Sequence, residues 1–265
     1  MLSQEEIHKI AAVESEHWWY RGMREMFFAL LAPYLGGSAQ QDSPSGGLQQ
    51  LRILDIGCGT GGNLIELSTL GEARGIDADP LCVEYCRHKG LDVRLGTMER
   101  LEERPGSFDL VTTFDVICQA DRTHAEHIFR GIADALAPGG LLALRESAMP
   151  IAAGAHDRAV GIRHRFTRAD LGSLLTRVGL EPLRLTYVNS LLFAPIVLQR
   201  RIGNMIDPTF TESDVKPAPA PLNSALLEVL RLEKHLLRLT DLPFGVSVFA
   251  IARKKTSQEG ATRAS

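Results

Sequence analysis

The segment from residue 51 to 62 joins a short apolar run to a cluster of glycines. The run Leu51-Arg52-Ile53-Leu54-Asp55-Ile56 has the composition of a buried strand, and it is followed directly by Gly57, Gly59, Gly61 and Gly62. Glycine lets a backbone turn sharply and approach a ligand without a Cβ in the way. Asp77 follows about twenty residues later, at a spacing where a carboxylate can accept hydrogen bonds from ribose hydroxyls. The segment predicts a nucleoside-binding crevice at the end of the first strand of a parallel sheet.

Two other interpretations of the same glycines have to be weighed. Gly57, Gly59 and Gly62 also satisfy the spacing G-x-G-x-x-G of dinucleotide-binding proteins. However, a carboxylate at Asp55 would repel a pyrophosphate, whereas it suits a ligand that carries an ammonium and a sulfonium group. We therefore expect a cationic ligand, and keep a dinucleotide, or a turn without any ligand, as alternatives.

Four segments together resemble the motifs of class I S-adenosylmethionine-dependent methyltransferases. Residues 54–61 resemble the first motif and residues 75–79 the second, while residues 108–111 and 136–140 agree with two later motifs in order and spacing. This resemblance covers roughly residues 51–147 and implies S-adenosylmethionine as the cofactor. Further pieces, among them residues 16–20 and 155–160, resemble a bacterial type-11-like subgroup whose substrates are poorly defined.

Length, charge and cysteine spacing exclude several other classes. With 265 residues, 45% of them hydrophobic, the chain is long enough for one α/β domain with additions. A net charge of -3 provides no broad basic surface for DNA or RNA. The four cysteines lack the spacing of a zinc site, so no metal is expected. The polar, acidic N-terminal residues do not resemble a secretory signal, so we expect a cytoplasmic location.

Strand-like and helix-like segments alternate from residue 52 to 146, which predicts a parallel sheet covered on both faces. We expect an α/β fold with a Rossmann-like, seven-stranded methyltransferase sheet. Helices near residues 7–14 and 21–35 would precede it, a sixth strand would lie near residues 183–187, and a last strand would span residues 245–253. The family resemblance implies that the last strand is antiparallel beside the sixth.

The expected organisation has five parts. They are an N-terminal helical cap and linker (1–50), the S-adenosylmethionine-binding core (51–190), a helical insertion (191–243), the last strand (244–254) and a disordered tail (255–265). The insertion contains an apolar run at residues 191–198, the pair Arg200-Arg201 and a helix with one apolar side from Leu222 to Leu239. Its apolar run is too short to span a bilayer. A lid over the substrate pocket, a homodimer contact and membrane contact through residues 191–206 remain open.

The resemblance also implies which residues hold the cofactor. The candidates are Asp55, Gly57, Cys58, Gly59 and Gly61 around the methionine part, Asp77 on the ribose, Ala78, Thr97 and Met98 near the adenine, and Asp115 lining the cleft. Candidates for the substrate side or a lid are His17, Trp18, Trp19, Gln119 and Arg158. An aromatic face attracts a sulfonium cation as it does an ammonium. Alternatively, or in addition, the two tryptophans anchor the N-terminal helix in the core.

Methyl transfer from a sulfonium mainly requires that acceptor, methyl group and sulfur are aligned and water is excluded. A hydroxyl acceptor must also lose a proton. His156 is the leading candidate for that base, Asp157 for its orienting partner and Glu146 for a second base. The alternatives are a surface loop held by Asp157 and Arg158, and a salt bridge of Glu146 with Arg145 or another arginine. We expect a methyltransferase acting on a hydroxyl or amine of a metabolite, saccharide or natural product. The other candidate is a methyltransferase-fold protein used for cyclase-type catalysis or as a binding scaffold.

Overall fold

The computed structural model describes residues 2–36, 50–207, 209, 213 and 217–256. Its centre is a seven-stranded sheet with the strand order β3-β2-β1-β4-β5-β7-β6. The strands are β1 (Leu51–Ile56), β2 (Gly71–Asp77), β3 (Asp92–Leu95), β4 (Phe108–Phe114), β5 (Leu136–Ser147), β6 (Leu180–Val188) and β7 (Ser247–Lys254). β1 to β5 pair in parallel, and β7 is antiparallel to both β5 and β6. The predicted methyltransferase sheet, with its antiparallel last strand beside the sixth, is confirmed.

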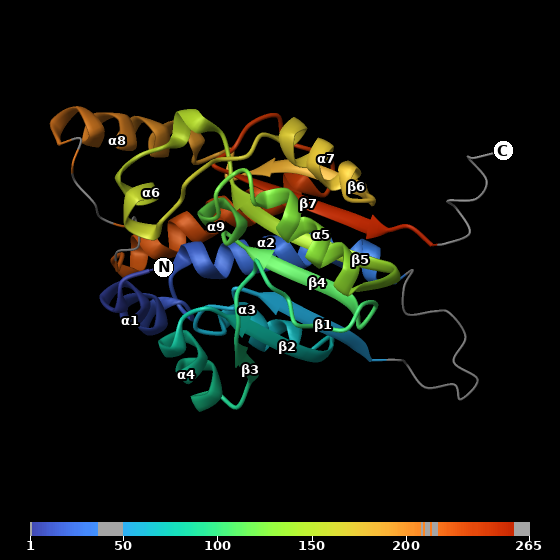
Figure 1. The fold of residues 1–265 in the computed structure, drawn as a ribbon. Coiled ribbons are helices and arrows are strands. Elements are labelled where there is room, and N and C mark those ends of the chain that lie inside the picture. Colours follow the sequence, from blue (N-terminus) through green and yellow to red (C-terminus); the bar gives the residue numbers. More distant parts are fainter. Residues whose placement is uncertain (1, 37–49, 208, 210–212, 214–216, 257–265) are drawn as a thin grey trace.

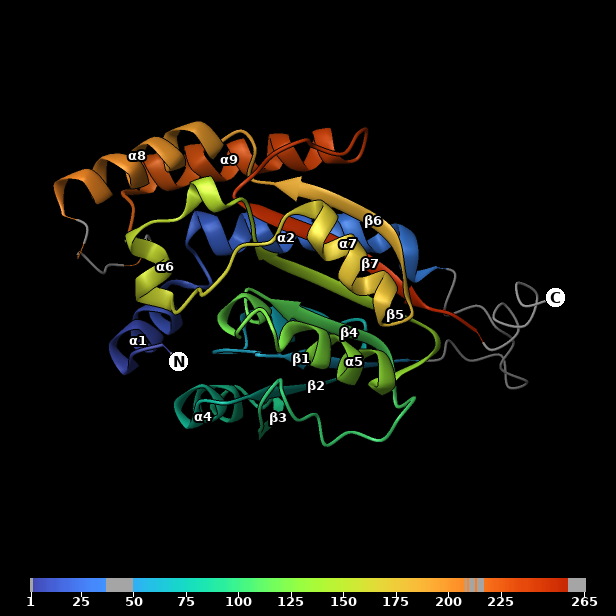
Figure 2. The same cartoon turned by 45° about the horizontal axis from the view of Figure 1, so that its top comes forward.

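Helices cover both faces of this sheet (Figures 1 and 2). On one face, α2 (Trp18–Leu35) and α9 (Ala220–Leu237) bury Leu30 and Leu230 in one cluster with Ile53 and Phe249 of the sheet. On the other face, α5 (Ala125–Ala135) and α7 (Arg168–Arg177) pack against the central strands. A smaller cluster joins α3 (Gly62–Leu67) and α4 (Pro80–His88) near β2 and β3. The continuous apolar runs of β1 and β4 follow from this double coverage, because these strands are buried on both sides.

Three helices gather where the parallel strands end, at the left of Figure 1: α1 (Gln4–Val13), α6 (Ala155–Val160) and α8 (Phe193–Ile206). Two short 3-10 turns, η1 (Ile117–Gln119) and η2 (Pro150–Ala152), follow β4 and β5 at the same end. Ligands of open α/β sheets bind at the carboxyl ends of the strands. The fold therefore places these segments around the position expected for a site.

Several element boundaries differ from the sequence prediction. The second helix begins at Trp18 rather than near residue 21, because the His17 side chain caps it by accepting a hydrogen bond from the Trp19 N–H at 3.3 Å. β5 begins at Leu136 rather than at residue 141, because Leu136 already pairs with Phe108 of β4. Most of the predicted linker and of the predicted tail, residues 37–49 and 257–265, lies outside the described residues.

The second helix of the predicted insertion is fixed to the N-terminal segment. Arg231 and Lys234 of α9 both form ion pairs with Glu25 of α2, each at 2.7 Å. Asn223 accepts a hydrogen bond from the Trp18 N–H at 2.8 Å and donates one to the Glu16 carbonyl at 3.1 Å. α2 and α9, which lie far apart in the sequence, thus cover one face of the sheet together. Within the described parts of the chain, no helix is both long and apolar enough to cross a membrane.

Candidate cofactor and acceptor site

The glycine turn after β1 is held against the end of β2. The backbone N–H groups of Gly57 and Cys58 both donate to the Ile76 carbonyl, at 2.8 and 3.1 Å. Gly57 has φ +70°, and a Cβ there would lie 2.3 Å from a Val116 methyl group. Gly59 has φ +55°, and a Cβ there would meet no atom within 4 Å. The turn is therefore packed on the Val116 side and open at Gly59.

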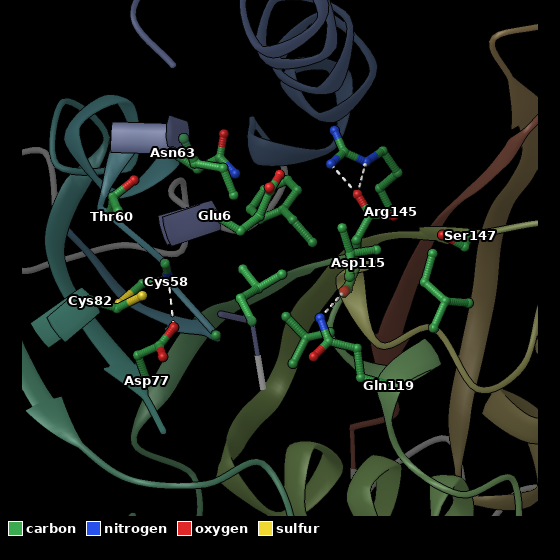
Figure 3. A pocket seen from close by; sticks show the side chains of 18 of the residues that line it. Glu6, Cys58, Thr60, Asn63, Asp77, Cys82, Asp115, Gln119, Arg145 and Ser147 are labelled. Atoms are coloured by element: carbon green, nitrogen blue, oxygen red, sulfur yellow. Dashed lines mark hydrogen bonds and ion pairs between the residues drawn. The ribbon is translucent and has the colours of Figure 1, made fainter. Parts of the chain in front are cut away.

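Asp77 ends β2 beside this turn (Figure 3). One carboxylate oxygen accepts a hydrogen bond from the Gly59 N–H at 2.8 Å, and the other accepts from the Asp79 N–H at 2.9 Å. Each oxygen keeps a second lone pair for a ligand hydroxyl. Burial raises the pKa of Asp77, while these backbone donors act in the opposite direction. The side chain is thus pre-positioned to accept hydrogen bonds from a ribose.

A cavity of about 620 Å³ runs from Asp77 and the glycine turn to the ends of β4 and β5. This volume lies within the range of small-molecule sites. Most predicted site residues line it: Gly57, Cys58, Gly59, Asp77, Ala78, Thr97, Met98, Asp115, Gln119, His17, Trp18, Trp19 and His156. Five predicted residues are not among its lining: Asp55, Gly61, Glu146, Asp157 and Arg158.

Asp55 lies behind the glycine turn. Its side chain is fully buried, and one carboxylate oxygen accepts a hydrogen bond from the Thr112 hydroxyl at 2.7 Å. The other oxygen has no hydrogen-bond partner among the described residues. Burial, aided by the nearby Asp77 charge, raises the pKa of Asp55 to about 7. Asp55 does not line the cavity, so a direct contact of this residue with the ligand stays a prediction. Gly61 also lies outside the cavity lining. It is the N-cap residue of α3 and has φ +93°.

Glu146 is buried outside the cavity lining, so its position does not support the prediction of a second base. Its carboxylate is completely buried and accepts hydrogen bonds from the Ile117 and Cys118 N–H groups at 3.1 and 3.0 Å. Burial, and then the Asp115 charge, raise the pKa of Glu146 to about 7. The side chain fixes the turn η1 after β4.

Asp157 and Arg158 both form contacts that hold the segment after β5, as the alternative interpretation of these residues expected. Both Asp157 carboxylate oxygens accept hydrogen bonds from Arg165, at 2.7 and 2.5 Å. Arg165 also donates to the Ala148 carbonyl at 2.9 Å, so this buried pair ties α6 to the end of β5. Arg158 donates to Asn204 of α8 at 3.2 Å. Asp157 is therefore directed at Arg165, while its neighbour His156 lines the cavity.

Asp115 and Arg145 meet in the middle of the cavity wall. Arg145 donates to one Asp115 oxygen through Nε at 3.0 Å and also through its terminal nitrogen. Gln119 points toward them and donates to the Asp115 carbonyl at 3.0 Å (Figure 3). Asp115 has φ +58°, a rare conformation for a residue other than glycine, and such strain is concentrated at functional sites. Sequence reasoning missed Arg145, although an arginine inside an apolar strand was a signal.

Residues of the N-terminal segment line the cavity beside the glycine turn, and the sequence analysis predicted only His17, Trp18 and Trp19 among them. Glu14, after α1, forms an ion pair with Lys89 at 2.6 Å, and Lys89 also donates to the Thr60 carbonyl at 2.7 Å. Tyr20 lines the cavity, and burial together with the Glu6 and Glu14 carboxylates raises its pKa. Nothing in the local pattern of these residues marks them, because their role depends on where α1 and α2 pack. Trp18 and Trp19 pack against the core cluster and line the cavity at once.

The residues at this site fit S-adenosylmethionine. The open space at Gly59 would accept a close ligand, and the Asp77 oxygens keep lone pairs that ribose hydroxyls could use. Trp18 and Trp19 line the cavity with aromatic side chains, which attract cations. Fold and site together define an S-adenosylmethionine-binding protein of the class I methyltransferase type.

Residues 53–140 match the family model described as a methyltransferase domain. The chain thus contains a class I S-adenosylmethionine-dependent methyltransferase domain, and S-adenosylmethionine is its cofactor. No curated protein matches the chain.

Solved structures share this fold at low sequence identity. A chain of the complex that contains the Haloferax volcanii Trm112 methyltransferase activator is 16% identical, with 94% of this chain and 98% of that chain covered and a TM-score of 0.57. Haemonchus contortus phosphoethanolamine N-methyltransferase 2, in complex with S-adenosylmethionine, is 18% identical (coverage 89% and 58%, TM-score 0.51). The [4+2]-cyclase SpnF is 18% identical (coverage 87% and 94%, TM-score 0.51). The fold therefore occurs in methyltransferases and in a cyclase.

Proposed function

We propose that the protein is an enzyme that transfers a methyl group from S-adenosylmethionine to a hydroxyl or amine of a small molecule, such as a metabolite, saccharide or natural product. One continuous cavity supports this proposal. It joins the glycine turn and Asp77, at one end, to the polar side chains of Asp115, Gln119 and His156 at the other. When bound, S-adenosylmethionine supplies an activated methyl group. The protein's part is to align the acceptor with it and to exclude water.

At the polar end of the cavity, where the acceptor would bind, the position of His156 supports its assignment as general base. It lies on α6 and lines the cavity, so it can take a proton from a hydroxyl acceptor without help from Asp157. Asp115, held by Arg145, offers a carboxylate to the donor groups of the same acceptor. We further propose a cytoplasmic enzyme that acts without nucleic acid.

The test has two stages. First, calorimetry measures the affinity of the purified chain for S-adenosylmethionine and for a nicotinamide dinucleotide; selective binding of the former is expected. Second, incubation with donor and a panel of amines, sugars and phenols is followed by mass spectrometry for the methylated product and S-adenosylhomocysteine. Tight donor binding without transfer to any acceptor would favour the cyclase or scaffold alternative, for which SpnF shows that the fold is suited.

A further inference from the structure

Glu6 carries a buried carboxylate on the wall of the cavity. The residue lies on α1, lines the cavity and is only 7% exposed. Figure 3 shows its side chain among those that line the pocket. The Oε1 atom has no hydrogen-bond partner, and among the described residues the carboxylate forms no ion pair. A buried carboxylate without a counterion costs free energy, so a ligand that supplies a cation would be bound favourably at this position.

The other carboxylates that line the cavity have partners or face solvent. Three of them form ion pairs with a lysine or an arginine: Glu14, Asp115 and Asp121. Two accept hydrogen bonds from backbone N–H groups: Asp77 and Asp79. Glu99 is exposed. Among the described lining residues, Glu6 is therefore the carboxylate that is both buried and uncompensated.

The start of α1 does not explain why the Glu6 side chain is buried. Ser3 and Glu6 have the spacing of a capping box, in which the glutamate side chain also accepts a hydrogen bond from the backbone N–H of the serine. Only one half of the box is formed, since Ser3 Oγ accepts from the Glu6 N–H at 3.2 Å while Glu6 Oε1 has no partner. A carboxylate in the first turn of a helix is favourable without burial, as at Glu5, whose side chain is 79% exposed.

The helix that carries Glu6 is fixed to the glycine turn, on the donor side of the cavity. Glu14, the C-cap of α1, pairs with Lys89, and Lys89 also donates to the carbonyl of Thr60 in the turn at 2.7 Å. A Cβ at Gly62, the first residue of α3, would lie 2.6 Å from Glu14 Oε2. The end of α1 therefore contacts the turn directly, which holds the whole helix beside the donor.

The chemistry of the donor selects the group that Glu6 can bind. S-adenosylmethionine has two cationic groups, but a sulfonium has no N–H, whereas an ammonium has three N–H donors for a carboxylate. Asp55, the carboxylate that the sequence suggested for a cationic ligand, does not line the cavity. We propose that Glu6 binds the α-ammonium group of S-adenosylmethionine, an assignment that rests on the donor of the proposed function. A protonated amine of an acceptor offers the same chemistry, and the test separates the two sources.

The test measures the affinity of the full chain for three nucleosides by isothermal calorimetry, without any acceptor. S-adenosylmethionine carries the sulfonium and the ammonium, S-adenosylhomocysteine carries the ammonium alone, and 5′-methylthioadenosine carries neither. For Glu6→Gln, which removes the charge with little change of shape, we expect the affinity for the first two to fall by about 10- to 100-fold. The affinity for 5′-methylthioadenosine should not change. Glu5→Gln is the matched control, since Glu5 pairs with Lys9 at the surface and does not line the cavity.

Three results would overturn the proposal. An unchanged affinity of Glu6→Gln for S-adenosylmethionine would leave an acceptor amine as the source of the cation. A loss for S-adenosylmethionine but not for S-adenosylhomocysteine would assign Glu6 to the sulfonium, and an equal loss for all three nucleosides would show a general disturbance of the site. If wild-type protein binds the donor but methylates no acceptor, the proposed enzymatic function fails and the assignment of Glu6 stands, so the two failures are distinguishable.

Discussion

Asp77 and Gly59 connect the ends of two neighbouring strands, because the Asp77 carboxylate accepts a hydrogen bond from the Gly59 N–H at 2.8 Å. Gly59 belongs to the turn after β1, and Asp77 is the last residue of β2. The bond therefore sets the spacing between the glycine turn and the Asp77 carboxylate without help from a ligand. Such pre-positioning lowers the conformational entropy that the side chain loses when a ligand binds.

Replacing that carboxylate should weaken cofactor binding. For Asp77→Asn we expect the affinity for S-adenosylmethionine to fall by about 10- to 100-fold, because hydrogen bonds to a charged group contribute about 1.5–3 kcal/mol. Isothermal calorimetry measures this. Asp92→Asn is the control, since Asp92 pairs with Arg74 at the surface and does not line the cavity. Equal affinities of the two variants would contradict the assignment.

The glycine turn allows a matched pair of alanine substitutions. Gly57 and Gly106 have similar φ values of +70° and +73°, but only at Gly57 would a Cβ collide with Val116. Gly106→Ala should cost about 1–2 kcal/mol of unfolding free energy from the left-handed backbone alone. Gly57→Ala should cost about 1–3 kcal/mol more, from overpacking. Urea denaturation compares them, and adding Val116→Ala to Gly57→Ala should recover part of the difference. Identical losses would show that the contact with Val116 is unimportant.

His156 is tested by its effect on rate rather than on stability. With a hydroxyl acceptor, His156→Ala should lower kcat by roughly two to four orders of magnitude if the imidazole removes the proton. An amine that is already deprotonated in solution should be methylated at nearly the wild-type rate. His127→Ala is the control, because the exposed His127 ring contacts the Glu99 carbonyl and does not line the cavity. A full-rate His156→Ala enzyme on a hydroxyl acceptor would rule out the base.

The buried pair of Asp157 and Arg165 should matter for stability. Asp157→Asn leaves the Arg165 charge buried without its counterion, which we expect to cost about 3 kcal/mol of unfolding free energy. Asp121→Asn, which breaks the exposed ion pair with Arg163, should cost less than about 1 kcal/mol. Urea titration measures the unfolding free energy of both variants and of the wild type. A negligible loss for Asp157→Asn would argue that Asp157 has a task other than holding α6.

The raised pKa of Glu146 predicts that the stability of the protein depends on pH. This pKa is raised to about 7 in the folded protein, so between about pH 4.5 and 7 the native state binds a proton that the unfolded state has released. One such proton lowers the unfolding free energy by about 1.4 kcal/mol for each unit of rising pH in this window. Glu146→Gln removes this contribution. The stability of wild type relative to the variant should therefore fall from pH 5 to pH 7 and then level off. A difference that does not vary with pH would contradict a raised pKa.

The sequence predicted those features that depend on local pattern. Alternation of apolar runs and amphipathic segments indicated the strands. The glycines after Ile56 indicated the turn, because Gly57 and Gly59 both have positive φ, and a Cβ at Gly57 would also collide with Val116. Asp77 was predictable from its spacing alone. The start of α2 was missed by three residues, since its cap is a histidine, His17, whose ring takes the place of a more usual capping side chain.

By itself, then, the sequence determined the class of fold, the glycine turn and the carboxylate at the end of β2, since each depends on neighbours within a few residues or on regular spacing. The tertiary structure alone decided the acceptor end. His156 and Asp157 are adjacent in sequence, yet one lines the cavity and the other meets Arg165. Glu146 lies beside Arg145, but it is buried under η1 while Arg145 reaches Asp115 in the cavity. Side-chain direction at such positions is set by partners 8 to 30 residues away, and no local pattern encodes those partners.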